Sequence, residues 1–164
     1  GNALRPETWT SADAAGLPIL PGLARYDEVA AGAINHALRF TAYPTQRKYV
    51  WPARHYASSN TNPNVPPMGQ RFRLKASFNV APYPPQAQVI LNAFKTYGLI
   101  LADNGSNWYI SGAPDERWDN DLLVSAFASV KGSDFEAVDV SRLMFASNSA
   151  LALSRWLWLP VIAK

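Results

Sequence analysis

Cysteine is absent from this chain of 164 residues. Its absence excludes disulfide bonds, zinc–thiolate sites and thiol catalysis, although a protein of this size can be secreted and stable without disulfides. The sequence also lacks a G-x-S-x-G motif, a phosphate-binding loop and a G-x-G-x-x-G motif. A nucleophile elbow and the common nucleotide-binding loops are therefore not indicated.

Acidic residues are missing from the whole middle of the chain, between Val29 and Ala102. The same segment carries eight basic residues, namely Arg39, Arg47, Lys48, Arg54, Arg71, Arg73, Lys75 and Lys95. A cationic surface of this kind attracts polyanions such as nucleic acid or acidic glycans. Because no RNA-binding or helix-turn-helix pattern accompanies it, we favour pairing with carboxylates from the two ends of the chain and expect no nucleic-acid partner.

A long uninterrupted apolar run is also lacking. The most apolar segment, Ser141–Lys164, is broken by Asn148, Arg155 and Pro160, so we expect no membrane span. Residues 1–144 are predicted to form a single domain. Residues 145–164 are predicted to form an apolar tail, either a final packing helix or an interface segment.

The composition that is present, 48% apolar and 16% charged residues, is typical of a globular protein. Alternating apolar residues predict strands, and apolar residues spaced four apart after Pro85 predict a helix up to Tyr97. We expect an α+β fold, with an antiparallel sheet of about five to seven strands and two or three packed helices. The predicted strands are Ile34–Thr41, Lys48–Ala53, Gln70–Val80 and Phe135–Val140, and the other predicted helices are Tyr26–Gly32 and Asp121–Val130.

The most regular stretch is Tyr97–Gly112, in which two apolar runs flank Asp103-Asn104-Gly105-Ser106. Asn-Gly is a strong hairpin indicator because a type I′ turn needs positive φ at both central residues. The stretch is therefore predicted to be an antiparallel hairpin with Asp103 at its tip. In the second strand Trp108 is expected to face the core and Tyr109 to face outward.

Several stretches resemble a family of secreted, mostly uncharacterised proteins from soil bacteria. They are AGLPILPGLARYDE, HALRF, YVWPARHY, PPMGQRFRLKASF, FKTYGLILADNG and GSDFEAVDVS, and they fall between Asn2 and Met144. The resemblance implies secretion. It also implies that the chain corresponds to the C-terminal part of a larger domain, as expected for a truncated, metagenome-derived gene. More remote relatives keep residues matching Glu28, His36 and Asp103.

Two carboxylates across a cleft can hydrolyse a glycosidic bond, one as acid and the other as base or nucleophile. Glu28 and Asp103 are the candidate pair, with His36 as a third catalytic candidate, although a histidine on an apolar strand face is more often a hydrogen-bonded core residue. Trp51, Arg54 and Tyr109 are candidate substrate-binding residues.

We therefore predict a secreted carbohydrate-active domain. If the carboxylate pair is catalytic, the domain is a glycoside hydrolase. The alternative is a non-catalytic glycan-binding or interaction module that uses exposed aromatics and a cationic strand face. No cofactor is indicated, and two histidines are too few for a convincing metal site unless Glu28, His36 and Asp103 converge. A homo-oligomer is expected, formed through an unpaired sheet edge or the C-terminal tail.

Overall fold

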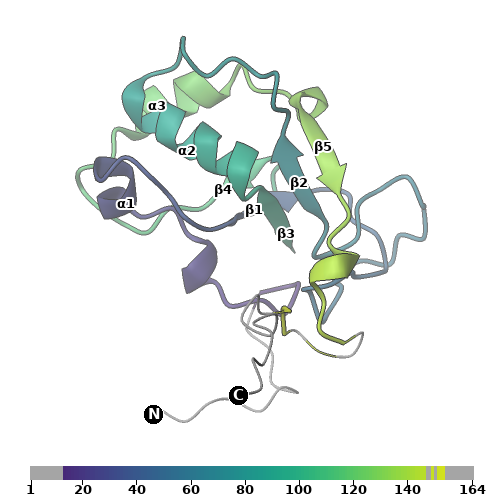
Figure 1. Ribbon diagram of the computed structural model, residues 1–164. Coiled ribbons are helices and arrows are strands. Elements are labelled where there is room, and N and C mark those ends of the chain that lie inside the picture. Colours follow the sequence, from purple (N-terminus) through teal and green to yellow (C-terminus); the bar gives the residue numbers. More distant parts are fainter. Residues whose placement is uncertain (1–12, 147–148, 150, 154–164) are drawn as a thin grey trace, which may run out of the picture.

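A mixed five-stranded sheet forms the centre of the protein, as seen in a computed structural model that describes residues 13–146, 149 and 151–153 (Figure 1). The order of strands across the sheet is β4-β1-β3-β2-β5. Their bounds are Leu38–Ala42 for β1, Arg71–Leu74 for β2, Leu99–Asn104 for β3, Tyr109–Ile110 for β4 and Phe135–Val138 for β5. The α+β class is therefore confirmed.

The prediction of a purely antiparallel sheet is wrong at its centre. β1 and β3 are parallel, whereas β4 on β1, β2 on β3 and β5 on β2 are antiparallel. Parallel neighbours need a long crossover between them. Here the crossover runs through the loop after β1, then β2 and then the helix α2, Pro85–Thr96, before the chain enters β3.

The hairpin prediction for Tyr97–Gly112 is also wrong. β3 and β4 are not neighbours, because β1 lies between them and pairs with both. Asn104-Gly105 does not form the type I′ turn, and the positive φ of this connection, 62°, belongs to Trp108 instead. Gly105 is constrained by space, since a Cβ there would lie 3.0 Å from the Thr41 Cβ.

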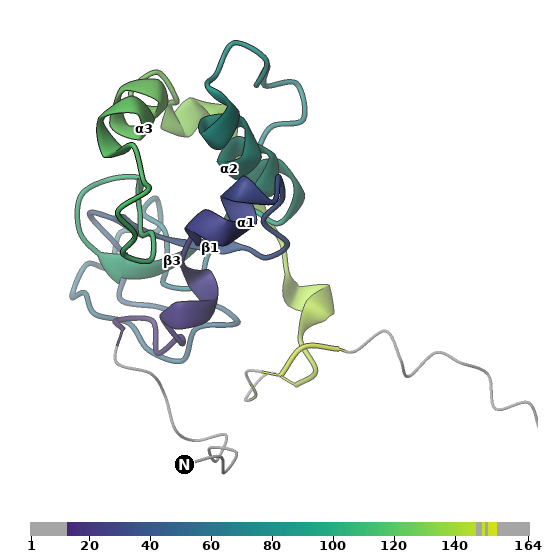
Figure 2. The same cartoon turned by 90° about the vertical axis from the view of Figure 1, so that its left-hand side faces the viewer.

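Three α-helices lie within the described part of the chain: α1 at Tyr26–Ala30, α2 and α3 at Asn120–Phe127. α1 and α3 both contact α2 (Figure 2). The side chain of Asp119 caps α3 by accepting a hydrogen bond from the Leu122 N–H. Three short 3-10 turns complete the set, η1 at Leu20–Gly22, η2 at Gly132–Asp134 and η3 at Ser141–Leu143.

Three predicted strands are shorter than their sequence patterns, since β5 also ends early, at Val138, and one is absent. β1 begins only at Leu38, and β2 ends at Leu74, where its partner β5 begins. The segment predicted as a strand at residues 48–53 makes only an isolated bridge between Tyr49 and Met68. A strand needs a continuous partner, and alternation of apolar residues cannot reveal whether one is present.

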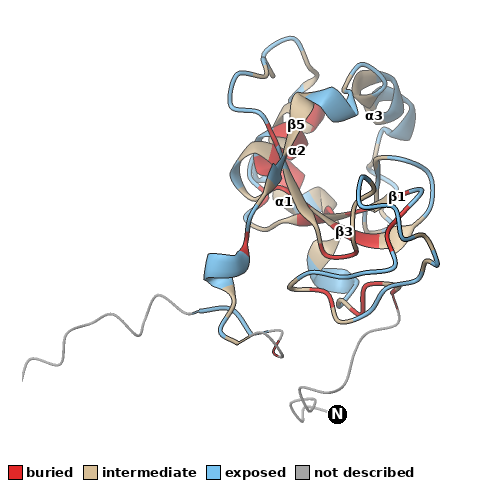
Figure 3. Ribbon diagram, turned by 90° about the vertical axis from the view of Figure 1, so that its right-hand side faces the viewer, coloured by how far each residue is buried: buried red, intermediate tan, exposed pale blue. Residues whose placement is uncertain are grey.

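Much of the core lies between the sheet and α2, and further buried residues, such as Ala15, Ala53 and Met68, lie in the loops (Figure 3). The fully buried large side chains include Leu38, Phe40, Leu99 and Leu101 from the strands and Ile90 and Leu91 from α2. Beside them Trp108 stacks between Phe40 and Phe135, with ring centroids 5.1 and 4.6 Å away. This packing leaves the opposite face of β4, β1 and β3 for polar side chains.

The segment after β5 lies at the edge of the described structure. An antiparallel bridge joins Met144 to Ala152, and the Leu153 N–H donates to the Leu143 carbonyl. The predicted packing helix within residues 145–164 falls largely outside the described residues. Of the helices in the described part, none has the length and apolar character needed to cross a membrane.

Candidate functional site

Asp103 and Tyr109 lie on one face of the sheet, on either side of β1. Thr41 of β1 pairs with Asp103 of β3 on its parallel side and with Tyr109 of β4 on its antiparallel side. Directly opposed residues of neighbouring strands point to the same face. A register shift between Phe40 and Thr41 leaves Ala102 as an extra residue in β3, and this bulge brings Asp103 opposite Thr41.

Three exposed tyrosines lie around this end of the β1–β3 pair, and we call Tyr43, Tyr56 and Tyr109 the tyrosine surface. Their exposed fractions are 71%, 51% and 67%. The Tyr43 N–H donates to the Asn107 Oδ1 at 2.7 Å, which ties the residue after β1 to the β3–β4 connection. The position of Tyr56 follows from its neighbour Ala57, whose carbonyl accepts a hydrogen bond from Asn104.

Asn104, the last residue of β3, binds two parts of the loop between β1 and β2, the loop that carries Tyr43 and Tyr56. Its Nδ2 donates to the Ala57 carbonyl at 2.6 Å, and its Oδ1 accepts from the Thr45 hydroxyl at 2.5 Å. Both ends of the amide are therefore occupied. The tyrosine surface is therefore assembled from two parts of the β1–β2 loop and from β4, which lie near the end of the β1–β3 pair.

Asp103 also belongs to a charged group with Asp13 and Arg39. The Arg39 Nη2 lies 3.7 Å from the Asp13 Oδ2 and 3.9 Å from the Asp103 Oδ2, and its Nη1 donates to the Ser111 hydroxyl at 3.1 Å. The side chain of Asp13 is 1% exposed, whereas that of Asp103 is 39% exposed. Asp103 is therefore the carboxylate of this group that a ligand can reach.

Burial raises the pKa of Asp13, and this effect outweighs the hydrogen bond from the Leu17 N–H and the charge of Arg39, which both lower it. The Asp103 carboxylate adds to the rise through its own negative charge. The Asp13 Oδ1 accepts from the Leu17 N–H at 2.7 Å, so this carboxyl also stabilises the turn at residues 13–17.

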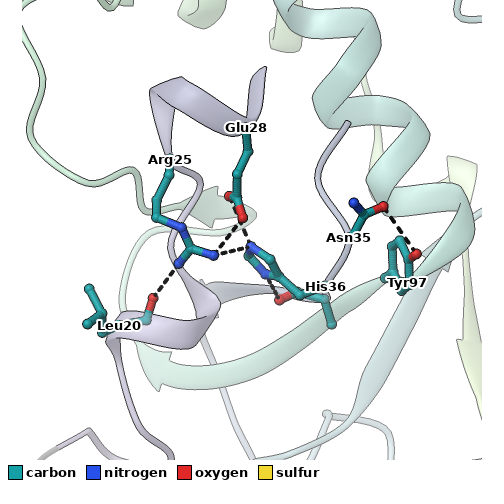
Figure 4. A network of polar contacts seen from close by, with 7 residues as sticks. Leu20, Arg25, Glu28, Asn35, His36 and Tyr97 are labelled. Atoms are coloured by element: carbon teal, nitrogen blue, oxygen red, sulfur yellow. Dashed lines mark hydrogen bonds and ion pairs between the residues drawn. The ribbon is translucent and has the colours of Figure 1, made fainter. Parts of the chain in front are cut away.

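A second polar group joins α1 to the start of β1 (Figure 4). The Arg25 Nη2 donates to the Glu28 Oε1 at 2.6 Å, and the His36 Nε2 lies 3.1 Å from both the Arg25 Nη2 and the Glu28 Oε2. The His36 Nδ1 lies 2.9 Å from the Ala37 carbonyl, which accepts a hydrogen bond when this nitrogen is protonated. Burial raises the pKa of Glu28, but the hydrogen bonds from His36 and Arg25 outweigh it and hold the pKa below its ordinary value.

The predicted site residues thus fall into separate places. Glu28 and His36 come together, and Asp103 and Tyr109 share a sheet face. In the described part of the chain, no hydrogen bond or ion pair links Asp103 to Glu28 or His36. The same part contains no group of three His, Asp or Glu side chains placed to hold a metal ion. The pairing of Glu28 with Asp103 in catalysis stays a prediction.

The remaining two candidates lie in the loop between β1 and β2. The Arg54 N–H donates to the Ala15 carbonyl at 2.8 Å, which places its backbone against the turn that begins at Asp13. Trp51 lines a hollow beside the end of β5. Their roles in substrate binding stay predictions.

Sequence reasoning did not single out Asp13, Arg25 or Arg39 as site residues, nor Tyr43 and Tyr56. The absence of acids from the middle of the chain did predict that basic residues there pair with carboxylates from the ends. Arg39 with Asp13 and Asp103, and Arg73 with Glu136, agree with this prediction. Lys75 and Lys95 instead donate to backbone carbonyls. No comparable pattern marks the tyrosines, because they lie in loops.

Comparisons of the chain with protein-family models, with curated proteins and with solved structures found no match. The resemblance to secreted soil-bacterial proteins therefore stays a prediction.

Proposed function

We propose that the chain is a secreted carbohydrate-binding domain whose ligand lies across the tyrosine surface and Asp103. The observation that carries the proposal is that three exposed tyrosines lie on chain segments that meet near the end of the β1–β3 pair, where Asp103 is accessible to solvent. Sugars have apolar ring faces that pack on aromatic side chains, and hydroxyl groups that donate to carboxylates. Secretion is the part of the proposal that follows from the family resemblance alone.

Binding is favoured over hydrolysis because only one carboxylate of the Arg39 group faces the solvent. A glycoside hydrolase of the common kind needs two carboxyl groups about 5 to 10 Å apart, both able to reach the substrate. Asp13 is enclosed, and its Oδ1 is already used by the Leu17 N–H. Glu28 is held by Arg25 and His36 and serves to join α1 to β1.

The test measures retention on insoluble polysaccharides, such as cellulose, chitin and xylan, and then affinity for the soluble oligosaccharide of the retained class. Replacing Tyr109→Ala should weaken binding about three- to tenfold, the value of one aromatic stacking contact. Asp103→Asn should also weaken binding, because the amide loses the charge that strengthens hydrogen bonds from sugar hydroxyls.

Tyr97→Ala is the matched control. Tyr97 precedes β3 at the opposite end of the parallel pair, where its hydroxyl donates to the Asn35 Oδ1 at 3.4 Å (Figure 4). It should leave binding unchanged. Equal loss with Tyr97→Ala and Tyr109→Ala, or no retention by the wild type, would refute the proposal. Turnover of chromogenic glycosides that Asp103→Asn abolishes would replace it with the hydrolase prediction.

A further inference from the structure

A hollow of about 520 Å³ lies between the segment Val50–Trp51 and the chain that runs from the end of β5 into η3. Its volume is in the range of small-molecule sites, about 300 to 1,000 Å³. The walls are mostly apolar and include Val50, Val138, Val140 and Met144. It does not involve the tyrosine surface or Asp103.

Trp51 contributes an apolar wall in spite of its polar indole nitrogen. The Nε1 is enclosed and has no hydrogen-bond partner among the described residues. Because that nitrogen has no access to solvent, a molecule in the hollow meets the carbon atoms of the indole. An indole ring is also the best aromatic partner for a cation.

The polar groups of the hollow are few and mostly occupied. The Gln70 Nε2 donates to the Arg71 carbonyl at 3.1 Å and to the Val138 carbonyl at 3.4 Å. The Ser141 N–H donates to the Asp139 Oδ1 at 2.9 Å, and with the Ser141 hydroxyl it lowers the pKa of Asp139. The hollow therefore combines apolar walls with one carboxylate that carries its negative charge at neutral pH.

We propose that this hollow binds a small organic cation, an ammonium group with apolar substituents, between Trp51 and Asp139. Such a ligand needs one negative charge and apolar walls, which is what the hollow offers. A sugar ring needs partners for several hydroxyl groups, whereas the Gln70 Nε2 and the Ser141 N–H are already engaged. The charge of Arg142 acts on Asp139 and opposes the cation, so its removal should help.

The probe is choline, with its neutral isostere 3,3-dimethylbutan-1-ol as the comparison ligand. The indole N–H resonances of the full chain, six in number because the sequence has six tryptophans, are followed by NMR during titration, and Trp51→Phe assigns the relevant one. Choline should shift the Trp51 resonance in a saturable way, and the neutral alcohol should bind about fivefold more weakly, the worth of one exposed charge pair.

Two variants with opposite expected effects make the test specific. Asp139→Asn should remove the preference for choline over the alcohol, and Arg142→Gln should strengthen choline binding. Glu116→Gln, an exposed acid outside the hollow, removes the same charge as Asp139→Asn and should change nothing. The proposal is overturned by equal binding of the two probes, by no shift at 100-fold excess choline, or by a larger shift with methyl glucoside.

Discussion

Trp108 offers the sharpest test of how the β3–β4 connection presents Tyr109. Its φ of 62° is left-handed, a conformation that costs a residue with a side chain about 1 to 2 kcal/mol relative to glycine. Its indole offsets this cost by packing among Phe40, Phe135 and Phe72, with centroids 4.6 to 5.5 Å away. Removing the indole should therefore destabilise the fold by about 3 kcal/mol, at the low end for tryptophan because the residue is only half-buried.

The diagnostic comparison is between Trp108→Ala and Trp108→Gly, which lose the same contacts. In a right-handed conformation alanine is favoured over glycine by about 0.5 to 1 kcal/mol, because glycine has more freedom in the unfolded chain. At φ 62° the order should reverse, leaving the glycine variant about 0.5 to 1 kcal/mol more stable than the alanine variant.

Urea unfolding followed by circular dichroism gives both free energies of unfolding. Trp108→Phe, which retains an aromatic ring, should lie closest to the wild type. If the alanine variant proves more stable than the glycine variant, the left-handed conformation is not a constraint and the argument for this connection fails.

Three other predictions concern the folded chain. The pKa of Glu28 is lower in the folded than in the unfolded state, so the ionised carboxylate stabilises the fold above pH 4.5, and this stabilisation is lost as the pH falls through the folded-state pKa. The free energy of unfolding should therefore fall less below pH 4.5 in Glu28→Gln than in the wild type. Equal losses of stability in the two proteins would contradict this. Gly98→Ala should lower the free energy of unfolding by at least about 2 kcal/mol more than Gly32→Ala does. Both glycines have positive φ, but only a Cβ at Gly98 would clash, lying 2.4 Å from the Phe72 carbonyl oxygen. Similar melting temperatures of the two variants would refute this prediction. We also propose that the chain dimerises through the β5 edge or the exposed Leu143 and Phe145, so light scattering should give twice the 18.0 kDa chain mass, and a monomer at high concentration would contradict it.

Local sequence patterns were enough to predict the elements that depend on residues close together in the chain. α2 begins at Pro85, as the proline and the apolar spacing indicate, and β5 follows the alternation that starts at Phe135. The cap of α3 by Asp119 is a contact over three residues and was also predictable. Tyr109 faces outward as expected, because Trp108 occupies the aromatic cluster behind it.

The topology needed information that no local pattern contains. Asn-Gly between two apolar runs predicts a hairpin only when those runs prefer each other, and here both pair with β1 instead. The parallel β1–β3 pair arises because β1 lies between β3 and β4. The tyrosine surface depends on the path of the β1–β2 loop, whose sequence has no apolar periodicity. The Asn104 side-chain amide fixes this path through hydrogen bonds to residues 47 and 59 positions away in the sequence.

The insertion of β1 between β3 and β4 has a consequence for folding during synthesis. Both partners of β1 are made about sixty residues after it, so at about 5 to 20 residues per second its two edges stay unpaired for several seconds on the ribosome. The β1–β3 contacts are long-range, which slows folding because the intervening chain must close before the contacts form. An expression fragment that ends before Tyr109 lacks β4 and leaves one edge of β1 open.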